Sequence, residues 1–368
     1  MKNKKRFLIR ILKISAVFIA LLIILPTITV FAGRGINAVR FNIRDENGIW
    51  ERSYVQLGGI EQVVHIRGRS KDNPIIIWLH GGPGWSNAYE LVPWEHMIKH
   101  DYTLVHWDQR GTGRTYLRNP GAQLSFDILI ADLDDLVDYV IGRFNQPVYI
   151  IGTSWGSVLG IEYASRHPER IEGFVGVVQN IDFGEGMIVT LEYGYKLAIA
   201  AEDIATAEEI KELYNRLSAI NFTISSNDLH FDKILLAQSL PFAHLPVPSG
   251  EGQALAVMFS PWLGMTEIGQ LFNVMLVNNR LLFERNRPLF DTLGTFVPPE
   301  TLEVPVAFIM GSIDFITPTS LVVEYYKRVE APSRQLFIID GSGHAPFRSQ
   351  PELFTDMLRE ALKGFRNG

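Results

Sequence analysis

Residues Tyr149 to Gly160, YIIGTSWGSVLG, place one serine between two glycines where an apolar run changes to a helix-like pattern. Glycine is unfavourable in both helices and strands, so Gly152 and Gly156 around Ser154 indicate a turn too tight for side chains. A serine hydroxyl held on such a turn is a potential nucleophile, but it needs a neighbouring base. The chemistry suggested is acyl transfer through Ser154, which requires a histidine and an acid from elsewhere in the chain.

The candidate bases are the four histidines that follow Ser154, namely His167, His230, His244 and His344. His167 lies in SRHPER, at the end of the helical pattern after the serine, where a cation is an ordinary structural feature. His230 and His244 lie in a stretch without strand signals. His344 lies in DGSGHAPF, a glycine-rich loop directly after the final strand-like run, from which an imidazole could reach the serine. We therefore predict His344 as the base.

The candidate acid should follow the preceding strand-like run, where FIMGSIDFITP supplies Asp314. An acid in this position holds the imidazole in the required tautomer and stabilises the imidazolium that forms during the reaction. Asp340 is the runner-up, but it lies only four residues before His344, at the end of a strand. The sequence thus predicts Ser154, Asp314 and His344 as a catalytic triad.

Acyl transfer also requires two backbone N–H donors for the oxyanion of the tetrahedral intermediate. One is expected from Trp155, the residue after the nucleophile, and the other from the loop WLHGGPGWS. In that loop Gly81 and Gly82 permit close backbone approach and Pro83 stiffens the turn, so we expect this loop to supply the second donor.

A second glycine-containing loop, DQRGTGRT, follows Trp107. It lacks the Gly-Lys-Ser/Thr ending of a phosphate-binding loop, so we do not interpret it as one. We expect instead that a contact between Asp108 and Arg110 braces the neighbouring loop.

The elements that position these residues alternate between strands and helices. Short apolar runs such as PIIIWL and PVYII are typical of strands covered on both faces, and amphipathic helices such as Phe126–Phe144 separate them. This alternation predicts a mostly parallel sheet with helices on both faces. The expected strands are Ser53–Gly58, Glu61–Gly68, Pro74–Leu79, Tyr102–Trp107, Pro147–Ile151, Gly173–Val178, Val304–Met310 and Gln335–Ile339.

The alternation breaks between about Asp182 and Pro299, which predicts an inserted helical cap. Within it, Thr206–Ile220 is expected as a helix opened by a capping box of Thr206 and Glu209. Phe259–Phe283 is rich in Phe, Leu, Met and Trp. The predicted domains are residues 51–181 and 300–368 as the core and 182–299 as the cap. A last helix is expected at Pro351–Phe365.

The N-terminus predicts a membrane helix. Residues 1–13 hold six Lys/Arg and no Asp/Glu, and Ile14–Ala32 carries no charge over 19 residues, about 28 Å as a helix. We interpret residues 1–32 as an uncleaved single-pass anchor with the rest outside the cytoplasm, followed by a polar tether at 33–50. The alternative is a signal peptide cleaved near Ala32 with a secreted product.

Charge and composition exclude several functions. The net charge is −6, and without the basic residues 1–13 it is −12, which argues against nucleic acid as a partner. The chain has no cysteine, so disulfides and thiol catalysis are excluded. We expect no metal and no cofactor.

Three motifs together resemble the proline iminopeptidases, which are α/β hydrolases of the prolyl aminopeptidase type with a helical cap. They are His80-Gly81-Gly82-Pro83-Gly84, Asp108-Gln109-Arg110-Gly111-x-Gly113 and Gly152-x-Ser154-Trp155-Gly156-Ser157. The resemblance covers about residues 50–365, with GSID around Asp314 and GSGHA around His344. It implies an α/β-hydrolase fold, the same triad, and an oxyanion hole from Gly82 and Trp155.

The resemblance also implies a substrate. Family members bind the substrate's free amine through acidic residues of the cap, for which Glu185, Glu192, Glu267 and Glu284 are candidates here, although each is also expected as a solvated surface charge. The leading hypothesis is a membrane-tethered serine hydrolase that releases N-terminal proline or a similar residue from short peptides. The alternatives are an esterase or lipase-like enzyme, with Val257–Met275 lining an acyl pocket, and a non-enzymatic binding protein on a hydrolase fold. Ser154 at the turn disfavours reactions that need an aspartate nucleophile.

Overall fold

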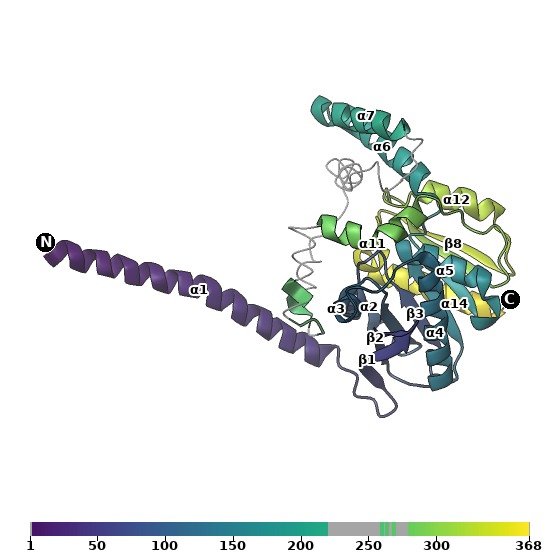
Figure 1. Cartoon of the computed structure of the whole chain (residues 1–368), viewed down its shortest axis with the longest axis horizontal. Helices are drawn as coiled ribbons and strands as arrows, with labels where there is room; N and C mark the ends of the chain where they lie inside the picture. The colour runs from purple at the N-terminus through teal and green to yellow at the C-terminus, as the bar shows by residue number, and fades with distance from the viewer. Residues whose placement is uncertain (1, 220–257, 261, 265–266, 270–278, 368) are drawn as a thin grey trace.

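The computed structural model describes residues 2–219, 258–260, 262–264, 267–269 and 279–367, which are built around one eight-stranded sheet (Figure 1). The strand order is β1-β2-β4-β3-β5-β6-β7-β8. The strands β1 and β2 pair antiparallel, as do β2 and β4, and every later pair is parallel. The predicted mostly parallel sheet is confirmed, and each expected strand run forms a strand. Their bounds are β1 Ile49–Leu57, β2 Ile60–Gly68, β3 Ile75–Leu79, β4 Thr103–Asp108, β5 Val148–Thr153, β6 Gly173–Val177, β7 Val306–Gly311 and β8 Arg334–Ile339.

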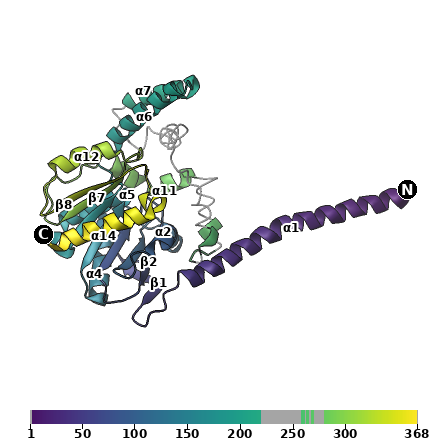
Figure 2. The same ribbon diagram turned by 180° about the vertical axis from the view of Figure 1, so that it is seen from behind.

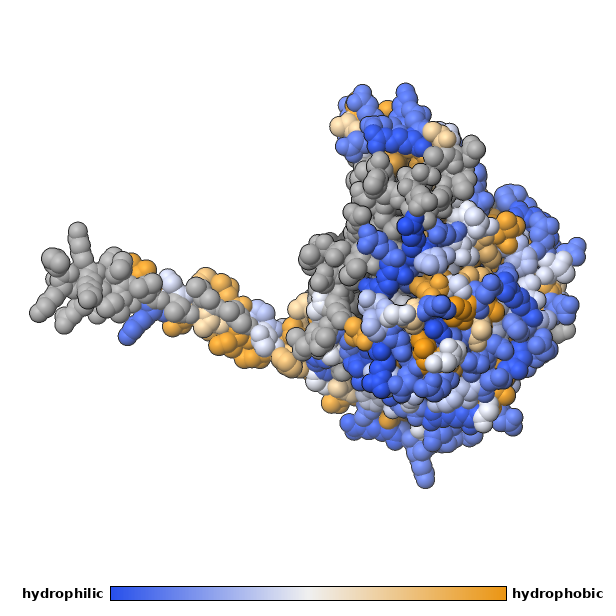
Figure 3. Space-filling model, viewed as in Figure 1, coloured by the Kyte–Doolittle hydropathy of each residue, from blue (hydrophilic) through white to orange (hydrophobic). Residues whose placement is uncertain are grey.

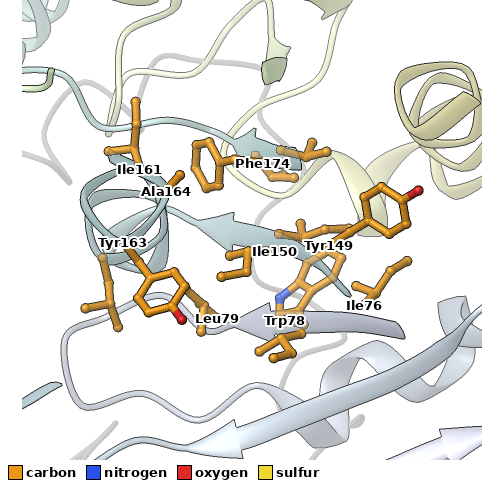
Figure 4. Packing of buried hydrophobic residues seen from close by; sticks show 14 of the residues in the cluster. Ile76, Trp78, Leu79, Tyr149, Ile150, Ile161, Tyr163, Ala164 and Phe174 are labelled. Atoms are coloured by element: carbon orange, nitrogen blue, oxygen red, sulfur yellow. The ribbon is translucent and has the colours of Figure 1, made fainter. Parts of the chain in front are cut away.

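Helices cover both faces of the sheet, and apolar side chains decide how closely they approach. On one face, α5 (Trp155–Arg166) packs against β5 and β6 (Figure 4). The contact is close, and only a glycine fits at position 160, because a Cβ there would stand 2.5 Å from the ring of Phe174. On the other face, the rings of Trp94 and Phe354 lie 5.1 and 6.3 Å from the ring of Trp78. These two come from α2 (Ala88–Glu95) and α14 (Pro351–Asn367). The remaining core helices are α3 (Gly113–Arg118), α4 (Phe126–Phe144), the 3-10 turn η1 (Pro168–Arg170), α12 (Thr319–Arg328) and α13 (Pro346–Ser349).

The chain between β6 and β7 contains α6 (Phe183–Ala200), α7 (Ile204–Ser218) and α11 (Asn279–Leu293), and no strand occurs among its described residues. The helices α6 and α7 project above the core in Figure 1 and bury Leu191, Ile210 and Leu217 between them. His230 and His244 lie outside the described residues, as do 261, 265–266 and 270–278 within Phe259–Phe283.

The predicted capping box at Thr206 and Glu209 is wrong. Helix α7 begins two residues earlier, and Asp203 is its N-cap, with its carboxylate accepting the N–H of Thr206 at 3.1 Å. The reason is that aspartate is at least as good an N-cap as threonine, and Asp203 stands one turn upstream.

The N-terminal helix α1 (Lys2–Arg40) continues well past the predicted anchor. Residues 33–40, expected in the tether, are therefore helical, and β1 begins inside the expected tether at Ile49. Among the described side chains of α1, large apolar ones between Ile11 and Val39 are exposed, and Figure 3 shows several of them in orange. The stretch Lys13–Arg40 contains an 18-residue window with a mean hydropathy of 2.7, and it is long and apolar enough to cross a membrane by length and composition.

Candidate active site

The serine predicted as the nucleophile stands at the junction of β5 and α5. Ser154 has φ 53° and ψ −117°, a left-handed conformation that non-glycine residues adopt at a strain cost. Its N–H donates to the carbonyl of Val177 at 3.1 Å, which holds the turn against the end of β6. A Cβ on Gly152 would lie 2.3 Å from the carbonyl oxygen of Gly156, and one on Gly156 would lie 2.2 Å from that of Leu79. Both glycines are therefore required by close backbone approach, as the sequence predicts.

The predicted acid and base lie together. His344 Nδ1 is 2.9 Å from Asp314 Oδ2 and 3.1 Å from Oδ1, and the Asp314 carboxylate is buried. The same carboxylate accepts the N–H of Ile316 at 2.9 Å and the hydroxyl of Thr317 at 2.8 Å, so its orientation is fixed by several donors. Asp340, the runner-up, accepts the hydroxyl of Ser312 at 3.1 Å near the surface. The geometry thus favours Asp314 over Asp340 as the partner of His344.

Ser154 is not hydrogen-bonded to His344 within the described part of the chain. The structure therefore brings two of the three predicted residues into direct contact and leaves the third apart. Catalytic hydrogen bonds in unliganded enzymes are often long and tighten only when substrate binds. The loop that carries Gly81 does reach Ser154, because a Cβ on Gly81 would lie 3.9 Å from Ser154 Oγ.

The loop predicted to supply the second oxyanion donor follows β3. His80 Nδ1–H donates to the carbonyl of Gly81 at 2.7 Å, and His80 Nε2 accepts the N–H of Gln109 at 3.4 Å. Burial lowers the pKa of His80 to about 4, so this imidazole is neutral near pH 7. Gly82 has φ 118°, and a Cβ there would lie 2.8 Å from the N of Gly84. Only glycine fits this loop conformation.

Gln109 joins this loop to the start of α5, a role that the sequence analysis missed. Its Oε1 accepts the indole N–H of Trp155 at 3.1 Å, and its Nε2 donates to the carbonyl of His80 at 3.5 Å. Gln109 thereby links the two segments from which the oxyanion donors are predicted. Gln109 lies in the motif DQRG, in which the sequence analysis assigned a structural contact only to the charged residues Asp108 and Arg110.

The expected contact between Asp108 and Arg110 is wrong, because each has a different partner. Asp108 accepts the hydroxyl of Ser86 at 2.5 Å and the N–H of Arg114 at 2.9 Å, and burial raises its pKa to about 6. Arg110 makes a bidentate pair with the fully buried Asp132, with both N–O distances at 2.8 Å. Their closeness in the sequence suggested the pair, but the two side chains, two residues apart, contact different neighbours. Both residues still brace loops at the end of β4.

A buried charged cluster lies beneath the helix that follows the oxyanion loop. Glu95 Oε1, at the end of α2, is 2.7 Å from both Arg67 Nη2 and His106 Nε2. Burial opposes ionisation of Glu95, but the charges and hydrogen bonds of Arg67 and His106 together outweigh it, so the pKa of Glu95 is lowered. Arg67 also donates to the carbonyl of Ala88 at 2.9 Å, so it holds both ends of α2. Nothing in the spacing of these residues along the sequence indicated this cluster.

The four candidate carboxylates of the insertion differ in their surroundings. Glu185 and Glu192 on α6 and Glu284 on α11 are exposed, as expected for surface charges. Glu267 differs, because its carboxylate is paired with Arg114 and accepts the N–H of Gly264 at 2.6 Å. The expectation of a solvated charge is therefore wrong for Glu267.

Comparison with known proteins shows which hydrolases the chain is similar to. Residues 70–199 match the family described as serine aminopeptidase, S33. The probable aminopeptidase YbaC of Bacillus subtilis (strain 168) is 25% identical over 309 residues, covering 83% of this chain and 93% of that protein. The proline iminopeptidase of Neisseria gonorrhoeae is 32% identical over 124 residues, which span 33% of this chain and only 38% of that protein.

A solved structure is similar over nearly the whole chain. The crystal structure of a membrane phospholipase A, a novel bacterial virulence factor, aligns with a TM-score of 0.58 at 18% identity and covers 99% of this chain and 100% of that chain. At this level of identity the likeness is one of fold, and the predicted α/β-hydrolase fold is confirmed.

Proposed function

Because this chain is a serine hydrolase and a proline iminopeptidase-like α/β-hydrolase, we propose that it releases N-terminal proline or a similar residue from short peptides. The observation that carries the proposal is the pair of Asp314 and the His344 imidazole at 2.9 Å, on the loops that follow β7 and β8. In the α/β hydrolases these loops meet the nucleophile turn at one edge of the sheet.

In the proposed mechanism Ser154 Oγ attacks the carbonyl carbon of the first peptide bond, and His344 Nε2 takes the hydroxyl proton. The N–H groups of Gly82 and Trp155 donate to the oxyanion. The C–N bond then breaks, His344 gives its proton to the leaving amine, and an ester between Ser154 and the released residue remains. Water, deprotonated by His344, hydrolyses this ester. Asp314 holds Nδ1–H of the imidazole throughout.

We assign recognition of the substrate's ammonium group to a carboxylate of the insertion. Glu267 suits this role least, because its charge is already paired with Arg114. Glu185 and Glu192 are exposed on α6.

The test compares a proline anilide with its N-acetylated form on the full-length protein. Acetylation removes the ammonium charge, so kcat/KM should fall tens-fold or more, since a hydrogen bond to a charged group contributes about 1.5–3 kcal/mol. Ser154→Ala is the control, with a loss of about 10⁴-fold on either substrate. Equal rates on the free and acetylated substrates would exclude the aminopeptidase.

Ester hydrolysis is the second candidate, favoured by one observation. The apolar helix α1 ends against the insertion, where a Cβ on Gly33 would lie 2.4 Å from the ring of Phe259. We propose that α1 anchors the protein in a membrane as a single pass with the catalytic domain outside the cytoplasm. Amphiphilic esters would then be available near the insertion. Short-chain esters in the same assay distinguish the two, because an esterase has no need of the ammonium group.

A further inference from the structure

The end of α1 beyond the uncharged stretch is built into the catalytic domain. Arg34 Nη1 donates to the carbonyl of Met258 at 3.4 Å, and its Nη2 donates to the carbonyl of Leu263. Asn37 Nδ2 donates to the carbonyl of Phe259 at 3.1 Å. Figures 1 and 2 both show this part of the insertion beside the end of α1.

The same segment of the insertion is fixed to the core on its other side. The ring of Trp262 lies 5.6 Å from that of Trp50 in an edge-on arrangement, and Arg52 donates to the Trp262 carbonyl at 2.8 Å. The guanidinium of Arg67, from the buried cluster under α2, lies 5.8 Å from the Trp262 ring. Residues 258–260 and 262–264 are therefore held between α1 and the core.

The charges along α1 determine how deep this segment would lie in a membrane. Between Lys13 and Arg34 there are 20 uncharged residues, Ile14 to Gly33, which span about 30 Å and match the hydrocarbon core. Gly33 is then the last residue in hydrocarbon, and Phe259 touches it. On the following turns Ile36 and Val39 are each 66% exposed and, three residues apart, share a face of the helix.

We propose that Phe259, Ile36 and Val39 form a membrane-contact surface, and that the partner is the headgroup region of the bilayer in which α1 is anchored. Apolar and aromatic side chains at the end of a hydrophobic span are typical of that region. The catalytic domain then rests on the bilayer and does not stand away from it on a tether. This inference rests on the proposed membrane anchoring of α1.

The absence of cysteine permits a direct test by single substitutions carrying a nitroxide label. We would reconstitute the full chain in phosphatidylcholine vesicles and measure the accessibility of each label to oxygen and to a water-soluble nickel chelate. Phe259→Cys and Ile36→Cys report on the proposed surface. Leu25→Cys, in the span, and Lys327→Cys, on α12 far from α1, are the lipid and water references.

The labels at positions 259 and 36 should have oxygen-to-nickel ratios between those of the two references and several-fold above that at 327. The ratio at position 36 tests the proposal even if Phe259→Cys disturbs folding. A loss of hydrolase activity in that variant would reveal such a disturbance. If the label at Leu25 is in lipid but the ratios at both surface positions equal that at Lys327, the membrane-contact surface does not exist. The proposed anchoring of α1 would then still hold. If the label at Leu25 is itself in water, the anchor and this surface are both wrong.

Discussion

At the scale of single residues, the assignment of the acid can be tested by one matched pair. Asp314→Asn should lower kcat by about 10⁴-fold, because an amide in this position stabilises the wrong tautomer of His344. Asp340→Asn is the control, since Asp340 contacts Ser312 and not the imidazole, and its kcat should stay near that of the wild type. The measurement is steady-state kinetics with circular dichroism to check folding. If Asp340→Asn alone lost activity, the acid of the triad would be Asp340 and not Asp314.

Two buried groups near the oxyanion loop should give the free energy of unfolding opposite dependences on pH. The folded pKa of His80 is about 4, below its unfolded value, so the unfolded state binds more protons between pH 4 and 6.5 and stability rises with pH. The folded pKa of Asp108 is about 6, above its unfolded value, so stability falls as pH rises from 4 to 6. Each of these pKa shifts corresponds to roughly 3 kcal/mol of free energy.

Denaturant unfolding of His80→Gln and Asp108→Asn between pH 4 and 6.5 checks this pair. His80→Gln should flatten the rise of stability with pH, and Asp108→Asn should steepen it. If both variants changed the slope in the same direction, the burial-driven shift of one of the two groups would be wrong.

At the scale of elements, the close contact between α5 and β3 is a strong constraint. Gly156→Ala would place a methyl group 2.2 Å from the carbonyl oxygen of Leu79. Relieving this clash requires a shift of the backbone, which costs free energy. We expect a loss of about 3 kcal/mol in the free energy of unfolding. Gly142→Ala, at an exposed position of α4 with open space around it, is the control and should stabilise by up to about 1 kcal/mol. Chemical denaturation measures both, and equal stability of the two variants would contradict the packing described.

Most elements of the fold could be predicted because their signals are local. Continuous apolar runs become strands such as β3, whose residues are all buried, and the glycines of the turn at Ser154 follow from steric need. Charged contacts between distant segments outside the recognised motifs could not be predicted, because nothing in a single sequence pairs them. Glu95 with Arg67 and His106 is one case, and Arg110 with Asp132 is another. The helical state of residues 33–40 was missed because it depends on packing against the insertion.

At the scale of the whole molecule, two truncations separate anchoring from folding. Removal of residues 1–32 should give a soluble and active protein, because Arg34, Asn37 and Phe41 remain. Removal of residues 1–41 also deletes these contacts and the buried Phe41 ring, so its thermal midpoint should be lower, by about 2–4 °C for each kcal/mol lost. Differential scanning calorimetry compares the two. Identical midpoints would mean that the end of α1 contributes nothing to the domain.

The pairing of β6 with β7 also constrains the protein while it is being made. These strands are neighbours in the sheet, yet the whole insertion separates them along the chain. During synthesis the half with Ser154 emerges first, with the edge of β6 unpaired, and Asp314 and His344 follow only after the insertion. A nascent chain thus holds the proposed nucleophile without its proposed base, so no active hydrolase is expected until β7 and β8 have joined the sheet.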